Sequence, residues 1–219
     1  RLKYMSKPSI FSEPASKLLL PAMTLTIITC TVALAVWGAS NDWQLLHLSL
    51  YQVFPVLGLL AFSIMWSQYM VEAVRNIRPQ LPDIRSFFSR TSWAVLVLIL
   101  FHPGLLIFQR FRDGYGLPPG SYLSYVAAMQ KWVVLLGSMS LMIFIAFEFK
   151  KFFEKHHAWH IVQILNDIAI IAIFYHGLRL GSQLQQGWFQ YLWYFYGLSL
   201  IAALGYKYYL KLHGAKATS

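Results

Sequence analysis

The sequence predicts an all-α membrane protein, a polytopic bundle of six transmembrane helices with both termini on the cytoplasmic side. Of its 219 residues 58% are hydrophobic and only 12% are charged, about half the charge that a soluble domain carries on its surface. The apolar residues form runs close to the roughly 20 residues that a helix needs to cross a bilayer. Aromatic residues make up 17% of the chain, and many stand at the ends of those runs, the depth that amphipathic rings prefer.

Six apolar runs are expected to be the spans. They are Leu18–Gly38, Leu46–Val71, Thr91–Phe108, Lys131–Phe149, Trp159–Arg179 and Tyr191–Tyr208. Turn-forming residues separate several of them, as at Asn41-Asp42, Arg78-Pro79 and the two glycine-containing stretches 114–120 and 181–187. The third run is short, and the loop after Phe108 would cap it. We therefore expect a cytoplasmic segment at 1–17, a six-helix transmembrane domain at 18–208 and a cytoplasmic tail at 209–219.

The distribution of basic residues predicts the orientation. Fourteen of the 18 Lys and Arg residues precede the first run, lie between the second and third, follow the fourth, or lie at the end of the sixth and beyond it. Only Arg110, Arg112, Lys131 and Arg179 fall on the other side. The positive-inside rule then places both termini in the cytoplasm, of the inner or plasma membrane if the chain is bacterial. The net charge of +10 is thus explained by the topology, with the lipid membrane as the expected partner. No nucleic-acid partner is expected.

Two histidines lie deep in apolar sequence. His102 is in the third run and His176 in the fifth, and both runs cross the bilayer in the same direction. At 1.5 Å per residue, His102 lies roughly 9 Å below Phe108 and His176 roughly 5 Å below Arg179. Ionisable residues at such depth are costly and mark functional sites by default. Both histidines are therefore expected in the outer half of the bilayer.

Two neutral imidazoles on separate helices are a standard axial pair for the iron of a b-type haem. His102 and His176 are the candidate cofactor-binding and metal-ligating residues, and the glycines nearby, Gly104 and Gly177, would leave room for a flat macrocycle. The other interpretation is that each histidine is hydrogen-bonded across a helix interface, as membrane bundles often show. Both interpretations stay open at this point. The one cysteine, Cys30, excludes an internal disulfide and a zinc site built on thiolates.

The two histidine stretches resemble the ferric reductase-like transmembrane domain. This family includes ferric reductases, NADPH oxidases and the haem-binding partner of the periplasmic methionine sulfoxide reductase. The stretches are Arg85–Leu106 and Trp159–Leu184, and HGLRLGS at 176–182 is close to the family's ending of the fifth helix. The resemblance implies six helices, cytoplasmic termini and haem-ligating histidines on the third and fifth helices.

The sequence also departs from the complete family pattern at one place. The complete family pattern stacks two haems, with a second histidine on each helix about four turns toward the inside. Counting back from His176 and His102 reaches Gln163 and Ser89, neither of which is a histidine. His160 is sixteen residues before His176, which points it about 160° away from that histidine around the helix. We expect the inner haem site to be lost and one haem b to remain, on the outer leaflet side.

A polar stripe occupies the inner half of the fifth run. His160, Gln163, Asn166 and Asp167 follow helical spacing, and a carboxylate at the depth of Asp167 must be protonated, hydrogen-bonded or paired. The stripe is expected to be a polar seam between helices, of uncertain role, rather than a proton path. A flavin or quinone is compatible with it, but no motif indicates one.

Three functions remain open. In the first, the chain is a haem electron-transfer protein, a transmembrane oxidoreductase subunit with no catalytic side chain of its own. Its sequence holds no Gly-rich dinucleotide fingerprint, so a partner subunit or separate electron donor would supply the electron. In the second, the chain is a haem-free structural subunit of a larger complex that keeps the fold. A transporter built on Asp167 is the third, and no repeat or broken helix favours it.

Overall fold

The chain folds into a bundle of long helices in a computed structural model that describes residues 13–81, 85–149, 159–185 and 187–214. Six long helices and no strand are found in these ranges. The long helices are α1 (Glu13–Ser40), α2 (Leu50–Ile77), α3 (Arg85–Arg112), α5 (Lys131–Glu148), α7 (Trp159–Leu180) and α8 (Trp188–Gly214). The short elements are α4 (Gly120–Leu123) and the 3-10 turns Leu45–His47, Ala128–Gln130 and Ser182–Leu184. The all-helical prediction is confirmed.

Five of the long helices, α1, α2, α3, α5 and α7, are long and apolar enough to cross a membrane, with mean hydropathies between 1.6 and 2.1. The chain is therefore an integral, multi-pass membrane protein. The remaining helix, α8, is as long as the others but is rich in Trp and Tyr and carries Lys207 and Lys211. Hydropathy scales count these aromatic residues as weakly polar, although their rings suit the membrane interface.

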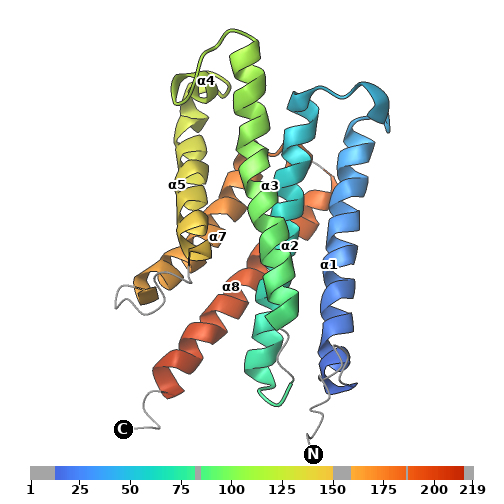
Figure 1. Ribbon diagram of the computed structural model, residues 1–219, viewed down its shortest axis with the longest axis vertical. Helices are drawn as coiled ribbons and strands as arrows, with labels where there is room; N and C mark the ends of the chain where they lie inside the picture. The colour runs from blue at the N-terminus through green and yellow to red at the C-terminus, as the bar shows by residue number, and fades with distance from the viewer. Residues whose placement is uncertain (1–12, 82–84, 150–158, 186, 215–219) are drawn as a thin grey trace, which may run out of the picture.

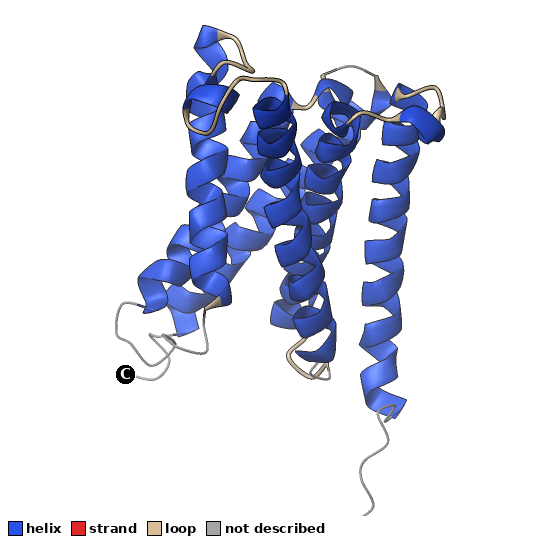
Figure 2. Ribbon diagram, turned by 45° about the horizontal axis from the view of Figure 1, so that its top comes forward, coloured by secondary structure: helices blue, strands red, loops and turns tan. Residues whose placement is uncertain are grey.

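The helices run up and down between two ends of the bundle (Figure 1). One end carries the connections 41–49 and 113–130 and the residues 181–185, and we call it the loop end. At the opposite end α1 begins at Glu13 and α8 finishes at Gly214, and we call it the tail end. In Figure 2 the longer tan loops are at the loop end, and only short tan stretches are at the tail end. Because α3 and α7 point the same way, residues at equivalent places on them come to the same level.

Several helices differ in length from the predicted spans. The helix expected at Thr91–Phe108 runs from Arg85 to Arg112, so it is 28 residues long rather than short. The second helix begins at Leu50 because Ser49 caps it: Gln52 Oε1 accepts from the Ser49 backbone N–H at 2.9 Å in a capping box. Helices α1 and α8 extend beyond the predicted 18–208 domain, to Glu13 and Gly214.

The core is aromatic and is centred on α2. Five rings form what we call the aromatic layer: Phe62 and Trp66 of α2, Phe174 of α7, and Trp193 and Tyr196 of α8. The ring centroids of Phe62 and Trp193 lie 4.4 Å apart, as do those of Trp66 and Tyr196. Gly197 lets α8 approach α7, because a Cβ there would overlap the Phe174 ring. The layer joins α2, α7 and α8, and aromatic pairs this close contribute to stability beyond their buried area.

Candidate functional site

His102 projects from α3 toward α2. Its Nδ1 lies 2.7 Å from the backbone oxygen of Phe54, and a carbonyl oxygen can only accept. The hydrogen of the neutral imidazole is therefore on Nδ1, which leaves Nε2 with a free lone pair. The bond crosses between two helices and fixes both the tautomer and the direction of the ring.

His176 repeats this arrangement in the other half of the bundle. From α7 its Nδ1 donates to the backbone oxygen of Val133 on α5 at 2.9 Å. Metal-ligating histidines are held in this manner, with one ring nitrogen donating to a carbonyl and the other on the metal.

A glycine stands opposite each imidazole. A Cβ on Gly58 of α2 would lie 2.9 Å from Cε1 of His102, and one on Gly137 of α5 would lie 2.6 Å from Cε1 of His176. Real Cβ atoms do not approach other atoms that closely. Each ring can therefore take its position only because its neighbour has no side chain.

The two halves share one local pattern. In each, a residue that supplies the carbonyl is followed four positions later by the glycine: Phe54 and Gly58 on α2, Val133 and Gly137 on α5. Residues four apart lie on one face of a helix, so the acceptor and the gap face the same partner helix. The sequence interpretation missed this repeat, although FPVLG at 54–58 and VVLLG at 133–137 carry its signal.

The glycines that the sequence interpretation singled out act differently. Nothing lies within 4 Å of a Cβ placed on Gly104, and Gly177 packs against Trp193 of α8. Gly177 does line the cavity described next. The close approach of each imidazole is nevertheless allowed by the glycine on the facing helix, Gly58 or Gly137.

One cavity, of about 810 Å³, joins the two histidines. This is within the range of about 300–1,000 Å³ typical of small-molecule and cofactor sites. Its walls near the imidazoles are apolar and come from four helices, for example Leu59, Leu106, Leu141 and Ile173. Both histidines, both facing glycines and Pro103 line it. The cavity is thus lined by two imidazole rings and by apolar side chains of the surrounding helices.

The cavity reaches the loop end, where its lining becomes polar. Tyr51 and Tyr125 stack there with ring centroids 5.6 Å apart, and Tyr125 is 41% exposed. Tyr51 donates to Asp113 at 2.5 Å. Partial burial raises the pKa of Tyr125, with the Arg110 guanidinium acting in the opposite direction. The Tyr125 phenol therefore stays protonated at neutral pH.

Arg110 anchors the loop that forms this mouth. It is only 6% exposed, and its Nε donates to the backbone oxygen of Ser121 at 3.1 Å. Its Cζ lies 3.4 Å from the centre of the Tyr115 ring. On the opposite rim, the Oε1 atom of Gln183 is buried without a hydrogen-bond partner in the described part of the chain. Since this residue lines the cavity, a donor group of a ligand or a water would satisfy it.

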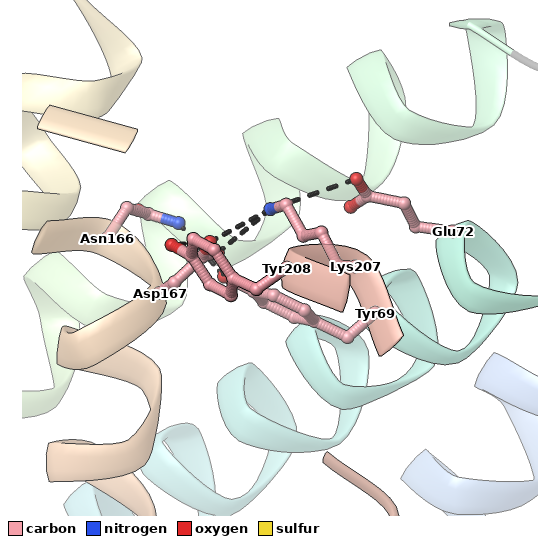
Figure 3. A network of polar contacts seen from close by, with 6 residues as sticks. All are labelled: Tyr69, Glu72, Asn166, Asp167, Lys207 and Tyr208. Atoms are coloured by element: carbon pink, nitrogen blue, oxygen red, sulfur yellow. Dashed lines mark hydrogen bonds and ion pairs between the residues drawn. The ribbon is translucent and has the colours of Figure 1, made fainter. Parts of the chain in front are cut away.

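A network of polar side chains joins α2, α7 and α8 in their tail-side halves, and its residues are drawn in Figure 3. The Asp167 carboxylate of α7 is 5% exposed and pairs with Lys207 of α8, whose Nζ is 2.9 and 3.1 Å from its two oxygens. Tyr69 of α2 and Tyr208 of α8 each donate to it at 2.9 Å. The Asn166 amide donates to the Tyr69 hydroxyl at 3.1 Å. The carboxylate is thereby fully paired, and three helices are tied together.

The predicted polar seam divides accordingly. Asn166 and Asp167 belong to the network. His160 is exposed in the first turn of α7, and Gln163 is half-buried; neither is part of the network drawn in Figure 3. The sequence interpretation missed Tyr69, Lys207 and Tyr208. Lys207 in particular was counted as a cytoplasmic charge, but its side chain is only 20% exposed and neutralises Asp167. Ser89, at the position of the lost inner ligand, is exposed.

The facing glycines give a direct prediction. Gly58→Ala and Gly137→Ala should each displace one imidazole, because the new methyl group would overlap it. If the cavity holds a bis-histidine haem, both variants should lose the low-spin absorption and electron-paramagnetic-resonance signals. Gly104→Ala, with open space around its Cβ, is the matched control and should keep them. Unchanged spectra in both facing-glycine variants would contradict the packing described above.

No protein-family model, curated protein or solved structure matches this chain.

Proposed function

We propose that this chain is an integral membrane electron-transfer protein that holds one b-type haem between His102 and His176. One observation carries the proposal. Two imidazoles on different helices each use Nδ1 for a backbone carbonyl, and both line the same apolar cavity. This supports axial ligation, in which the Nε2 atom of each ring would be the metal donor.

The residues present fit a porphyrin in two further respects. The cavity has the volume of a cofactor site, and its apolar middle and polar mouth match a macrocycle with an apolar ring and carboxylate side groups. When bound, the haem would supply one-electron chemistry, cycling its iron between the ferric and ferrous states. The protein would fix two neutral nitrogen ligands and a low dielectric, which set the reduction potential. His102 and His176 would remain ligands in both oxidation states.

We further propose that the bundle crosses the membrane six times, with α8 as the sixth span, and that its tail end faces the cytoplasm. At 27 residues α8 is about 40 Å long, and its one charge inside the bundle, Lys207, is neutralised by Asp167. The basic residues also gather at the tail end. This topology, with histidines on the third and fifth long helices, supports membership of the ferric reductase-like family with the outer site retained.

The proposal is tested by purifying the protein in detergent and recording its absorption. A b-type Soret band that shifts on adding dithionite is the expected result, with about one haem per chain by pyridine haemochrome. Protein that is folded by circular dichroism, colourless as isolated and unable to take up added haemin would overturn the proposal.

A second candidate is a haem-free structural subunit. The Asp167 network favours it, because it ties α2, α7 and α8 together with side chains in the half of the bundle where a second haem would otherwise bind. The haemin uptake experiment separates the two candidates. The network concerns only the tail-end half, whereas the cavity at the loop end remains open to a ligand.

A further inference from the structure

A second pocket, of about 430 Å³, lies at the loop end, where α7 finishes and α8 begins. We propose that it binds the headgroup of a phospholipid whose phosphate is followed by a hydrogen-bond donor, as in phosphatidylethanolamine. The proposal goes beyond the haem between His102 and His176 and does not depend on it. Three observations carry it: an arginine without a carboxylate partner, a pair of free amide oxygens, and a rim of exposed aromatic rings.

Arg179 supplies the positive charge of this pocket. It stands in the last turn of α7, and its guanidinium has no ion pair or hydrogen bond within the described ranges. The carboxylates of the loop end, Asp42 and Asp113, do not line the pocket, and Asp113 accepts hydrogen bonds from Tyr51 and Gln109 instead. A guanidinium left without a carboxylate suits a phosphate, because its fork of N–H groups matches two phosphate oxygens.

Further hydrogen-bond donors belong to the same lining. Tyr175 of α7 and Tyr194 of α8 both line the pocket, and their hydroxyl groups have no hydrogen-bond partner among the described residues. Gln190 of the lining lies in the first turn of α8, which begins at Trp188. Backbone N–H groups in a first turn have no intrahelical acceptor and favour an anion. The pocket therefore suits a phosphodiester.

Two glutamines add acceptors to these donors. Gln130 and Gln185 line the pocket, and the Nε2 atom of each donates to the backbone oxygen of Arg179, at 3.3 and 3.1 Å. These bonds fix the orientation of both amides and leave their oxygens without a partner in the described part of the chain. A ligand that uses both kinds of group brings a phosphate and an N–H or O–H group beside it. The ethanolamine ammonium, like that of lysine, has three N–H donors, whereas the trimethylated nitrogen of choline has none.

Exposed aromatic rings mark the depth of the pocket in the bilayer. Trp188 and Tyr191, in the first turn of α8, are 62% and 72% exposed. Trp132, at the start of α5, is 51% exposed and stacks on Tyr175 with ring centroids 5.4 Å apart. Trp and Tyr are enriched at the level of the lipid headgroups. A membrane lipid is therefore the source of phosphate that this pocket meets.

The test titrates the detergent-purified protein with phosphatidylethanolamine or phosphatidylcholine of the same acyl chains, and reads bound lipid by native mass spectrometry. The unaltered protein should bind one phosphatidylethanolamine saturably and phosphatidylcholine several-fold more weakly. Arg179→Gln should weaken phosphatidylethanolamine binding about tenfold, the loss expected for one charge-assisted hydrogen bond. Tyr194→Phe, which removes one donor and keeps the ring, should weaken it less. Arg112→Gln is the matched control, because Arg112 is also exposed at the loop end but lines neither pocket, and it should bind as the unaltered protein does.

Three outcomes overturn the inference. Equal affinity of the unaltered protein for the two lipids would exclude a headgroup read through its donor, and unchanged affinity in Arg179→Gln would exclude the site. Saturable binding of inorganic phosphate with no binding of either lipid would make it a site for a free anion. Because Arg179 is exposed, Arg179→Gln should keep the circular dichroism and thermal midpoint of the unaltered protein, so a loss of lipid reports the site and not the fold. None of these readouts involves the haem spectrum, so their failure is distinct from failure of the proposed function.

Discussion

His102→Ala and His176→Ala are each expected to abolish the low-spin b-type spectrum of the purified protein. Each removes one of the two imidazole rings that line the cavity, and a single imidazole does not hold iron in a six-coordinate low-spin state. Each also leaves an apolar gap beside Phe54 or Val133. We expect His102→Ala and His176→Ala to lose most of the bound haem, measured as the ratio of Soret to protein absorption.

His160→Ala is the matched control, since His160 lies on the same helix as His176 but is exposed. It should keep the full Soret ratio and the dithionite shift. Added imidazole should restore a low-spin spectrum to His102→Ala, because the free molecule fits the space of the missing ring. Retention of the spectrum in both alanine variants without imidazole would show that another group ligates the iron, or that the haem binds elsewhere.

Lys207→Met is expected to destabilise the bundle strongly. It leaves the buried Asp167 carboxylate without its cation, and removing one member of a buried ion pair typically costs about 3–5 kcal/mol. For a chain of this length that corresponds to a fall in Tm of roughly 10 °C. The measurement is thermal unfolding in detergent, followed by circular dichroism or tryptophan fluorescence.

The double variant Asp167→Asn/Lys207→Met should recover most of the lost stability, because it removes both charges and keeps an acceptor for Tyr69 and Tyr208. Glu72→Gln is the control: its carboxylate is 3.9 Å from Lys207 and 43% exposed, and exposed ion pairs contribute about 0–1 kcal/mol. If Lys207→Met were no less stable than Glu72→Gln, the pair would not hold α7 to α8.

The helices were predictable because bilayer thickness sets their length, and the apolar runs record that length directly. Their ends were not, since Ser49 caps α2 through one specific side-chain pair and α3 continues through polar residues that propensity alone does not exclude. His102 and His176 stood out because an ionisable residue is conspicuous among apolar neighbours. Gly58 and Gly137 did not, since glycine is common in membrane helices and their role depends on which helix faces them.

The Asp167 network was also only partly predictable from the sequence. The depth of Asp167 demanded a partner, but Lys207 lies 40 residues away and its charge agreed with a cytoplasmic position. Only the slanting path of α8 across the bundle (Figure 1) brings the two together. A sequence records which residues need partners more clearly than it records which residues supply them.

The ion pair between α7 and α8 also bears on how the chain enters the bilayer. A lone lysine near the middle of a helix costs about 2.5–3.5 kcal/mol to insert, and an aspartate costs a similar amount. Presented separately, α7 and α8 would each meet part of that barrier, because Asp167 and Lys207 lie eight and seven residues from the tail-side ends of their helices. Joined by the short connection 181–187 and neutralised by Asp167 and Lys207, they form a hairpin of zero net charge at that point. Insertion of the two helices as one unit is then favoured over insertion one at a time.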